Sequence, residues 1–138
     1  RWVRWVQDTD VFLANGGDAL YLAHWMRESG LAELIKNSNE KVWVGLSGGS
    51  MVMAPSIGKF FVGWNPPSGK DEALGWVDFA IFPHMGHPMC PENTEAAADT
   101  WAEKMGIPAY AMDDQTAIKI VDGKVEVISE GHWNKYNI

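Results

Sequence analysis

The chain has 138 residues, of which 46% are hydrophobic and 21% are charged. This length and hydrophobic content suit one globular domain with an adequate core. Lys and Arg number 11 against 18 Asp and Glu, which gives a formal net charge of −7, and no basic run is present that could follow a phosphate backbone. The composition therefore excludes nucleic acid and anionic membranes as expected partners.

Cysteine content and apolar runs predict where the protein resides. Cys90 is the only cysteine, so neither an intrachain disulfide nor a cysteine-cluster metal site can form, as is usual in a reducing compartment. The longest apolar stretches, such as residues 42–46 and 79–83, are far shorter than the roughly 20 residues of a membrane-spanning helix. We expect no transmembrane segment, no signal peptide and a cytoplasmic location.

The first predicted elements are a strand, a turn and a helix. Residues 11–14 form an apolar run that ends at Asn15-Gly16-Gly17-Asp18. Asp18 is a suitable N-cap for a helix over residues 19–29, where apolar side chains recur at helical spacing. Gly30 follows at the position of a left-handed C-terminal cap.

A second strand is predicted over residues 41–46, which are rich in Val and Trp. Residues 47–54 can turn directly into a short helix that ends near Pro55. The next segment, residues 56–75, has many glycines and prolines and is longer than a minimal connection. Long ordered loops are often functional.

The second half of the chain continues the alternation. A third strand over residues 77–82 leads to Pro83 and His84, and a helix is predicted over residues 91–105, with Pro91 at its first position and Gly106 after its end. A fourth strand follows over residues 109–112. The last predicted feature is a hairpin, with strands over residues 117–121 and 124–128 joined by Asp122-Gly123.

Strands that alternate with helices predict an α/β fold with a mostly parallel sheet, helices on both faces and a C-terminal β-hairpin. Ligand sites in such folds lie outside the carboxyl ends of the strands. Ser47 and His84 both occupy such positions.

Ser47 is the candidate nucleophile. Residues 45–49 read Gly-Leu-Ser-Gly-Gly, a G-x-S-x-G sequence in which the glycines allow a serine to sit on a tight strand-to-helix turn. The alternative interpretation is a glycine turn whose serine only caps the helix. A catalytic serine also needs a base, and His84 follows 37 residues later (84 − 47) at the end of the next strand.

The chain has three other histidines, and one of them competes with His84 for the role of general base. His24 is interpreted as a helix-surface residue and His132 as a tail residue, whereas His87 is a close competitor. The oxygen of a tetrahedral intermediate requires hydrogen-bond donors, which the backbone N–H groups of Gly48 and of the Gly16-Gly17 turn can supply. This acyl-transfer chemistry requires no metal and no organic cofactor.

Three motifs together resemble peptidase family S51, which comprises the aspartyl dipeptidases called peptidase E, with cyanophycinases as related proteins. They are Asn15-Gly16-Gly17-Asp18, Gly45-Leu46-Ser47-Gly48-Gly49-Ser50 and Phe82-Pro83-His84, and the similarity extends from about Asp10 to Gly131. The resemblance implies a fold like that of class I glutamine amidotransferases, Ser47 as nucleophile, His84 as catalytic histidine, and Gly17 with Gly48 as oxyanion hole. It also implies cleavage of dipeptides that begin with aspartate.

The chain departs from the family in three respects. Gly48 stands where the family usually has alanine, which should loosen the turn slightly but preserve the N–H. Residues 60–63 read Phe-Phe-Val-Gly, where some relatives place the aspartate that orients the histidine. Family members run to about two hundred residues, and strand-helix-strand material that precedes the Gly-Gly turn is absent here. We therefore expect one domain over residues 1–138, truncated at its N-terminus, that associates as a homo-oligomer through its bare sheet side.

The acid that supports His84 is assigned to Glu72, with Asp71 as the alternative, and both can also be solvated loop charges. Asp113-Asp114 before the hairpin is interpreted as a hydrogen-bonded turn in preference to a contact for a substrate ammonium group. Recognition of an N-terminal aspartate requires a nearby cation, and the sequence does not rank the three candidates, which are Arg27, Lys59 and Lys70.

The leading hypothesis is a serine peptidase that hydrolyses small peptides. Two alternatives stay open. One is a non-catalytic, truncated relative that serves as a binding or assembly domain, which the missing acid and missing strands favour. The other is an esterase or amidase of different specificity that uses the same serine and histidine.

Overall fold

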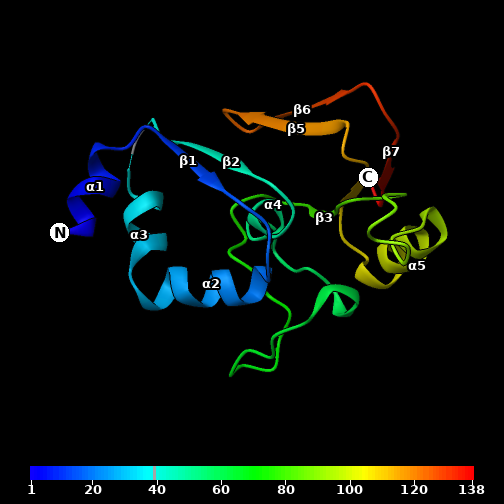
Figure 1. The fold of residues 1–138 in the computed structure, drawn as a ribbon, viewed down its shortest axis with the longest axis horizontal. Helices are drawn as coiled ribbons and strands as arrows, with labels where there is room; N and C mark the ends of the chain where they lie inside the picture. The colour runs from blue at the N-terminus through cyan, green and yellow to red at the C-terminus, as the bar shows by residue number, and fades with distance from the viewer. Residues whose placement is uncertain (39) are drawn as a thin grey trace. The chain divides into compact units, whose positions relative to one another are not determined.

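The computed structural model describes residues 1–38 and 40–138 (Figure 1). Their contacts divide the chain into two compact units, Arg1–Asp78 and Phe79–Ile138. Each unit has its own parallel strand pair, and each is described by itself below. The prediction of one domain over residues 1–138 stays a prediction.

The first unit is built around two parallel strands. Its elements are α1 (Trp2–Asp8), β1 (Val11–Ala14), α2 (Ala19–Glu28), α3 (Leu31–Lys36), β2 (Val42–Gly45), α4 (Gly48–Met51) and the 3-10 helix η1 (Lys59–Phe61). β1 and β2 pair in parallel from Val11 with Val42 to Ala14 with Gly45. The carboxyl ends of both strands therefore meet at one edge, as predicted.

The predicted start and end of α2 are confirmed. The Asp18 side chain accepts a hydrogen bond of 2.9 Å from the Tyr21 N–H, and Gly30 adopts the left-handed conformation with φ 81°. Neither α1 nor α3 was predicted from the sequence. α1 carries apolar side chains at helical spacing, such as Trp2, Val3 and Val6, but it is only seven residues long, and a short apolar run does not distinguish a helix from a strand.

In the described residues of the first unit, helices cover one face of the β1–β2 pair and leave the other exposed. Phe12 and Trp43 pack against a core formed by α2, α3 and the segment after α4. The alternate residues Val11, Leu13 and Val42 are exposed, Leu13 to 81%. The expectation of helices on both faces is therefore wrong for this strand pair, because an apolar run in a strand does not distinguish one covered face from two.

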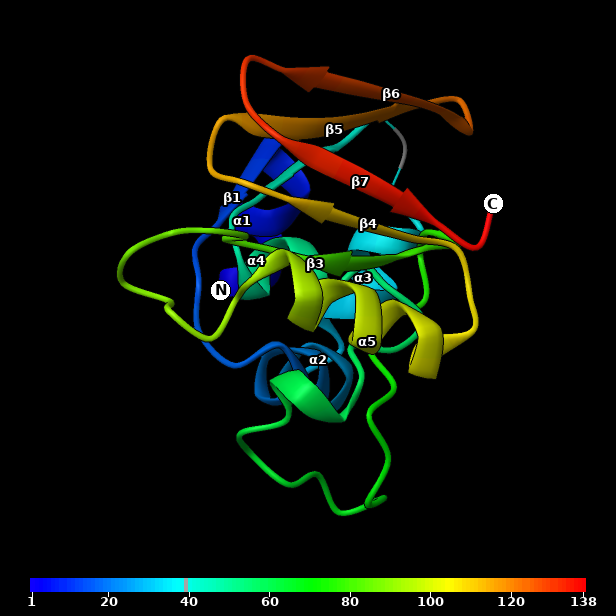
Figure 2. The same ribbon diagram turned by 90° about the vertical axis from the view of Figure 1, so that its right-hand side faces the viewer.

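The second unit combines a three-stranded sheet with a hairpin (Figure 2). Its elements are β3 (Ala80–Phe82), α5 (Glu95–Met105), β4 (Ala109–Met112), β5 (Thr116–Val121), β6 (Lys124–Ser129) and β7 (Trp133–Tyr136). β3 and β4 are parallel, whereas β7 runs antiparallel beside β4. α5 packs on this sheet through Trp101, whose ring centroid lies 5.4 Å from that of Phe82.

The prediction of a mostly parallel sheet is wrong. Among the described residues, β1–β2 and β3–β4 pair in parallel, whereas β4–β7 and β5–β6 pair antiparallel. The difference arises mainly from β7, which returns to β4 directly after the hairpin without the crossover that a parallel neighbour needs. The fold is mixed α/β, and likeness to class I glutamine amidotransferases stays a prediction.

The hairpin is confirmed, with Asp122 at φ 49° and Gly123 at φ 75° in its turn. The start predicted for the helix at Pro91 is wrong, because Thr94 caps α5 by accepting a hydrogen bond of 3.1 Å from the Ala97 N–H. Gly106 ends α5 in the left-handed conformation, as predicted. No helix in the described part of the chain is long and apolar enough to cross a membrane.

Candidate active site

Ser47 stands on a strained turn between β2 and α4. Its backbone angles are φ 55° and ψ −120°, outside the regions that residues with a side chain normally occupy. Strain of this kind persists only where the surroundings hold it, and it concentrates at functional sites. A serine on a sharp strand-to-helix turn is the arrangement of a nucleophile elbow, which presents the hydroxyl at the end of the strand.

Three glycines allow the elbow to pack closely. A Cβ on Gly45 would lie 2.2 Å from the Gly49 carbonyl oxygen, and a Cβ on Gly49 would lie 2.2 Å from the Ala14 oxygen. A Cβ on Gly48 would lie 2.1 Å from the Gly17 oxygen. Each of these contacts is with backbone, so a side chain at any of the three positions requires the chain to move.

The Gly-Gly turn after β1 lies directly against the elbow. A Cβ placed on Gly16 would be 3.4 Å from Ser47 Cβ, and Gly17 has φ 125°. No hydrogen bond from the Gly17 or Gly48 N–H occurs within the described residues, and the Ser47 hydroxyl has none there either. The predicted nucleophile and both predicted oxyanion donors thus come from adjoining turns of one unit.

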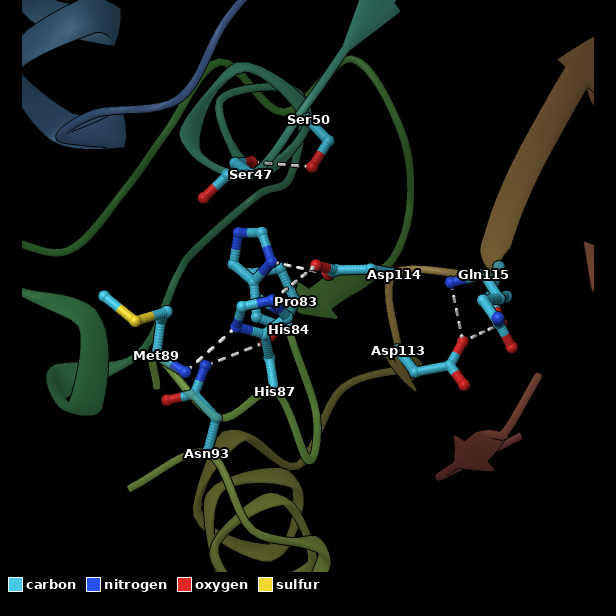
Figure 3. Close-up of polar contacts among 11 residues, drawn as sticks. Ser47, Ser50, Pro83, His84, His87, Met89, Asn93, Asp113, Asp114 and Gln115 are labelled. Atoms are coloured by element: carbon cyan, nitrogen blue, oxygen red, sulfur yellow. Dashed lines mark hydrogen bonds and ion pairs between the residues drawn. The ribbon is translucent and has the colours of Figure 1, made fainter. Parts of the chain in front are cut away.

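Ser50 is the other hydroxyl of the elbow, and it is occupied. Its Oγ donates a hydrogen bond of 2.6 Å to the Ser47 carbonyl oxygen (Figure 3). This bond and the Met51 N–H, at 2.9 Å from the same oxygen, close the first turn of α4. Ser50 therefore stabilises the elbow, whereas the Ser47 hydroxyl has no hydrogen bond to any described residue.

His84 and Asp114 form a pair in the second unit. His84 Nδ1 lies 2.6 Å from Asp114 Oδ1 (Figure 3). Each residue comes two positions after a strand end, His84 after Phe82 of β3 and Asp114 after Met112 of β4. When Nδ1–H donates to the carboxylate, Nε2 keeps its lone pair and can accept a proton.

The loop that carries His84 is held by Asn93, the only polar residue among those described as buried, with 5% exposure. Its Nδ2 donates to the Pro83 carbonyl oxygen at 2.8 Å, and its own carbonyl accepts from the Gly86 N–H at 2.8 Å. The Met85 N–H donates to the Met112 oxygen at 3.0 Å, which ties the loop to β4. These bonds maintain the positive φ of 56° at His84.

The competing histidines are placed differently from His84. His87 Nε2 lies 3.6 Å from Asp114 Oδ2, so His87 contacts the same carboxylate at longer range. His132 Nε2 lies 3.4 Å from Glu95 Oε1, and the His24 ring packs edge-on against Trp25 and at a tilt against Trp64. Among the histidines of the described residues, only His84 and His87 therefore share a carboxylate.

The structure brings a carboxylate other than Glu72 to His84. Glu72 Oε1 lies 3.8 Å from Lys70 Nζ, and the Glu72 backbone forms an isolated β-bridge with Ser56. No contact tests the catalytic role predicted for Glu72 or for Asp71, which stays a prediction. Asp114 was not predicted from the sequence to pair with His84. Its position just after the fourth strand, parallel to the one that precedes His84, was the signal that could have found it.

Asp113 is the residue that forms the predicted turn. Its carboxylate accepts hydrogen bonds from the Gln115 N–H at 3.0 Å, the Thr116 hydroxyl at 2.7 Å and the His132 N–H at 2.6 Å. Partial burial acts to raise the pKa of Asp113, but these hydrogen bonds outweigh it and hold the pKa below its ordinary value. The Asp113 carboxylate therefore stabilises the turn, whereas the Asp114 carboxylate faces His84 and His87.

The three candidate cations for a substrate carboxylate have different surroundings. The Arg27 guanidinium donates to the Ala73 carbonyl oxygen, and Lys70 is paired with Glu72. Lys59 has no ion-pair partner among the described residues and lines a surface pocket together with Lys70. The described part of the chain contains no group of three or more His, Cys, Asp or Glu side chains placed to hold a metal ion.

An α/β protein with a strained serine turn and a histidine–carboxylate pair at strand ends has the components of a hydrolytic enzyme. The sequence profile of peptidase family S51 matches residues 3–128, and the chain belongs to this family. The family resemblance that its motifs indicated is thus confirmed, and it supports a peptidase. No curated protein matches the chain in sequence.

The chain is also similar to a solved structure, a protein of Listeria monocytogenes EGD-e provisionally assigned as a peptidase E. The TM-score is 0.72 at 21% sequence identity. The match covers 94% of this chain and 64% of that chain. At this identity the similarity establishes the fold alone.

Proposed function

We propose that the protein is a serine-type peptidase in which Ser47 is the nucleophile, His84 the general base and Asp114 the residue that orients His84. The observation that carries the proposal is the strained backbone of Ser47, at φ 55° and ψ −120°, on a turn that glycines pack against the Gly16-Gly17 loop. Strain at a residue with a side chain is seldom retained without a functional reason. The 2.6 Å contact between His84 and Asp114 supplies the second half of the machinery.

The proposed mechanism requires Ser47 Oγ to come within hydrogen-bond distance of His84 Nε2. Nε2 takes the hydroxyl proton as Oγ attacks the peptide carbonyl carbon, and the N–H groups of Gly17 and Gly48 stabilise the oxyanion. His84 then donates that proton to the leaving amine, which leaves an acyl ester on Ser47. Water, deprotonated by His84, hydrolyses the ester and restores the free serine. Asp114 stabilises the imidazolium that forms in both halves.

The proposed substrates are small peptides, and in the first instance dipeptides with an N-terminal aspartate. Lys59 is the preferred cation for the aspartate side chain because it is the candidate without a competing partner in the described residues. The exposed face of Val11, Leu13 and Val42 further supports a homo-oligomer. A monodisperse monomer in sedimentation velocity would count against that association.

The test is hydrolysis of aspartyl-p-nitroanilide and of an Asp-X dipeptide by the intact chain and three variants. Ser47→Ala should abolish turnover, whereas Ser50→Ala, a change in the same turn, should keep activity within a few-fold because Ser50 only bonds to backbone. Asp114→Asn should lower kcat by about 10⁴-fold, as expected when the histidine loses its orienting carboxylate.

The outcomes distinguish the alternatives. Turnover that survives in Ser47→Ala contradicts the serine mechanism. Ser47-dependent hydrolysis of simple acyl esters without hydrolysis of the aspartyl substrates indicates an esterase or amidase of other specificity. Absence of any Ser47-dependent hydrolysis, with normal folding, favours the non-catalytic binding or assembly domain.

A further inference from the structure

His87 contacts Asp114 on the side that His84 leaves open. Asp114 Oδ1 lies 2.6 Å from His84 Nδ1, and Oδ2 lies 3.6 Å from His87 Nε2. Within the described residues, these two histidines are the only side chains that form a hydrogen bond or an ion pair with the Asp114 carboxylate. Their rings are 6.2 Å apart at an interplanar angle of 65°. The carboxylate therefore lies between the two imidazoles, with one oxygen toward each.

The other ring nitrogen of His87 fixes which tautomer the residue adopts. The Met89 backbone N–H donates a hydrogen bond to His87 Nδ1 at 3.1 Å (Figure 3). A nitrogen that accepts a hydrogen bond carries no proton, so neutral His87 must hold its proton on Nε2. This is the nitrogen that faces Asp114. The Met89 contact thus turns His87 into a directed N–H donor.

Asp114 needs such a second partner to hold its orientation. Its side chain is 45% exposed, and the terminal torsion of an aspartate has a broad, weakly restricted energy profile. With His84 alone as partner, the carboxylate can rotate and exchange its oxygens. A donor on Oδ2 restricts that rotation and keeps Oδ1 on His84 Nδ1.

The length of the contact determines how large the effect is. At 3.6 Å it is longer than an ordinary hydrogen bond, so it closes fully only with a small rotation of either half-exposed side chain or through a bridging water. An effect of one weak hydrogen bond is therefore expected, well below the effect of losing Asp114 itself.

We propose that His87 is a positioning residue, which acts through Asp114 to keep His84 in the Nδ1–H tautomer that leaves Nε2 free to accept a proton. The proposal rests on the proposed function of His84 as general base. It assigns a role to a second histidine that contacts no reacting atom.

Two substitutions separate the contacts of His87. His87→Asn keeps an acceptor near the place of Nδ1 for the Met89 N–H but removes the donor toward Asp114. His87→Gln places an amide N–H donor near the place of Nε2. With aspartyl-p-nitroanilide, His87→Asn should lower kcat about 3- to 10-fold with KM within twofold of the parent, whereas His87→Gln should stay within twofold in both.

The second measurement needs no turnover. Long-range ¹H–¹⁵N correlation spectra of the intact ¹⁵N-labelled chain report the tautomer of each of its four histidines. We expect Nδ1–H for His84 and Nε2–H for His87. In His87→Asn the His84 signals should move toward the Nε2–H form, and in His87→Gln they should not.

The proposal is overturned if His87 is found as the Nδ1–H tautomer, if His84 is unaffected in His87→Asn, or if both variants lose activity equally. The last result would mean that the ring only supports the loop. If the parent chain hydrolyses nothing, the proposed function fails, but the His84 tautomer in the two variants still decides whether His87 positions it through Asp114.

Discussion

Alanine at position 48 tests the steric argument for the elbow. The family usually has alanine there, which suggests a harmless change. In this structure, however, the new Cβ would lie 2.1 Å from the Gly17 carbonyl oxygen. Gly48→Ala should therefore displace the Gly16-Gly17 turn from Ser47.

The size of the displacement follows from the contact. Cβ atoms essentially never approach a non-bonded heavy atom closer than 3.0 Å, so the turn must move by about 0.9 Å (3.0 − 2.1). Overpacking of this kind costs about 1–3 kcal/mol of folding stability. A shift of about 1 Å in an oxyanion donor costs on the order of 10²-fold in rate. Gly48→Ala should thus lose about 10²-fold in kcat with little change in KM.

The measurements are kcat and KM for aspartyl-p-nitroanilide and the thermal unfolding midpoint. Gly30→Ala is the matched control, because Gly30 has φ 81° and nothing within 4 Å of a new Cβ. The strained backbone should cost this variant about 1–2 kcal/mol without disturbing the elbow. It should unfold at lower temperature and keep its kcat. A Gly48→Ala variant with parental stability and parental kcat would refute the claim that glycine is sterically required at this position.

Two further predictions concern the second unit. Asn93→Ala should lower the free energy of unfolding by about 1–3 kcal/mol, because it leaves the buried Pro83 carbonyl without its 2.8 Å hydrogen bond; an unchanged denaturation midpoint in urea would contradict this. The Glu95 pKa is held below its ordinary value of 4.5, first by the hydrogen bond from Asn134 and then by His132. A lowered carboxyl pKa adds stability above the unfolded pKa that is lost as pH falls through the folded pKa. Glu95→Gln should therefore unfold at lower temperature than the parent at pH 7, with the gap closing below pH 4.5, and an equal gap at pH 7 and pH 3 would show the reasoning to be wrong.

Local signals in the sequence predicted the elements that carry the elbow. The alternation of apolar runs with glycine turns located β1 and β2, and the N-cap at Asp18 located α2. Their parallel pairing then follows from the crossover through a helix, which is why Gly17 and Ser47 were expected at one strand edge. The φ of 55° at Ser47 is not encoded in any local propensity, since only packing by Gly45 and Gly49 allows it.

The acid and the last strand depended on long-range pairing, which the sequence does not display. Asp113 and Asp114 are identical in type and adjacent, yet one forms the turn and the other faces His84. That division depends on the His132 N–H, which reaches Asp113 from 19 residues further along the chain. His132 was interpreted as a tail residue, and the strand β7 that follows it was not predicted.

The short strand β7 bears on where the C-terminus of a shortened chain can be placed. The family profile ends at residue 128, before Trp133–Tyr136, so a chain shortened to the recognised family region would lose the edge partner of β4. It would also lose His132, whose backbone N–H donates to the Asp113 carboxylate and whose carbonyl oxygen accepts from the Asp113 N–H. The turn that contains Asp113, next to Asp114 in the chain, is thus held partly by residues outside the region by which the family is recognised. Boundaries drawn from family matching alone would remove an anchor of the turn beside the proposed catalytic acid while leaving Ser47, His84 and Asp114 themselves in place.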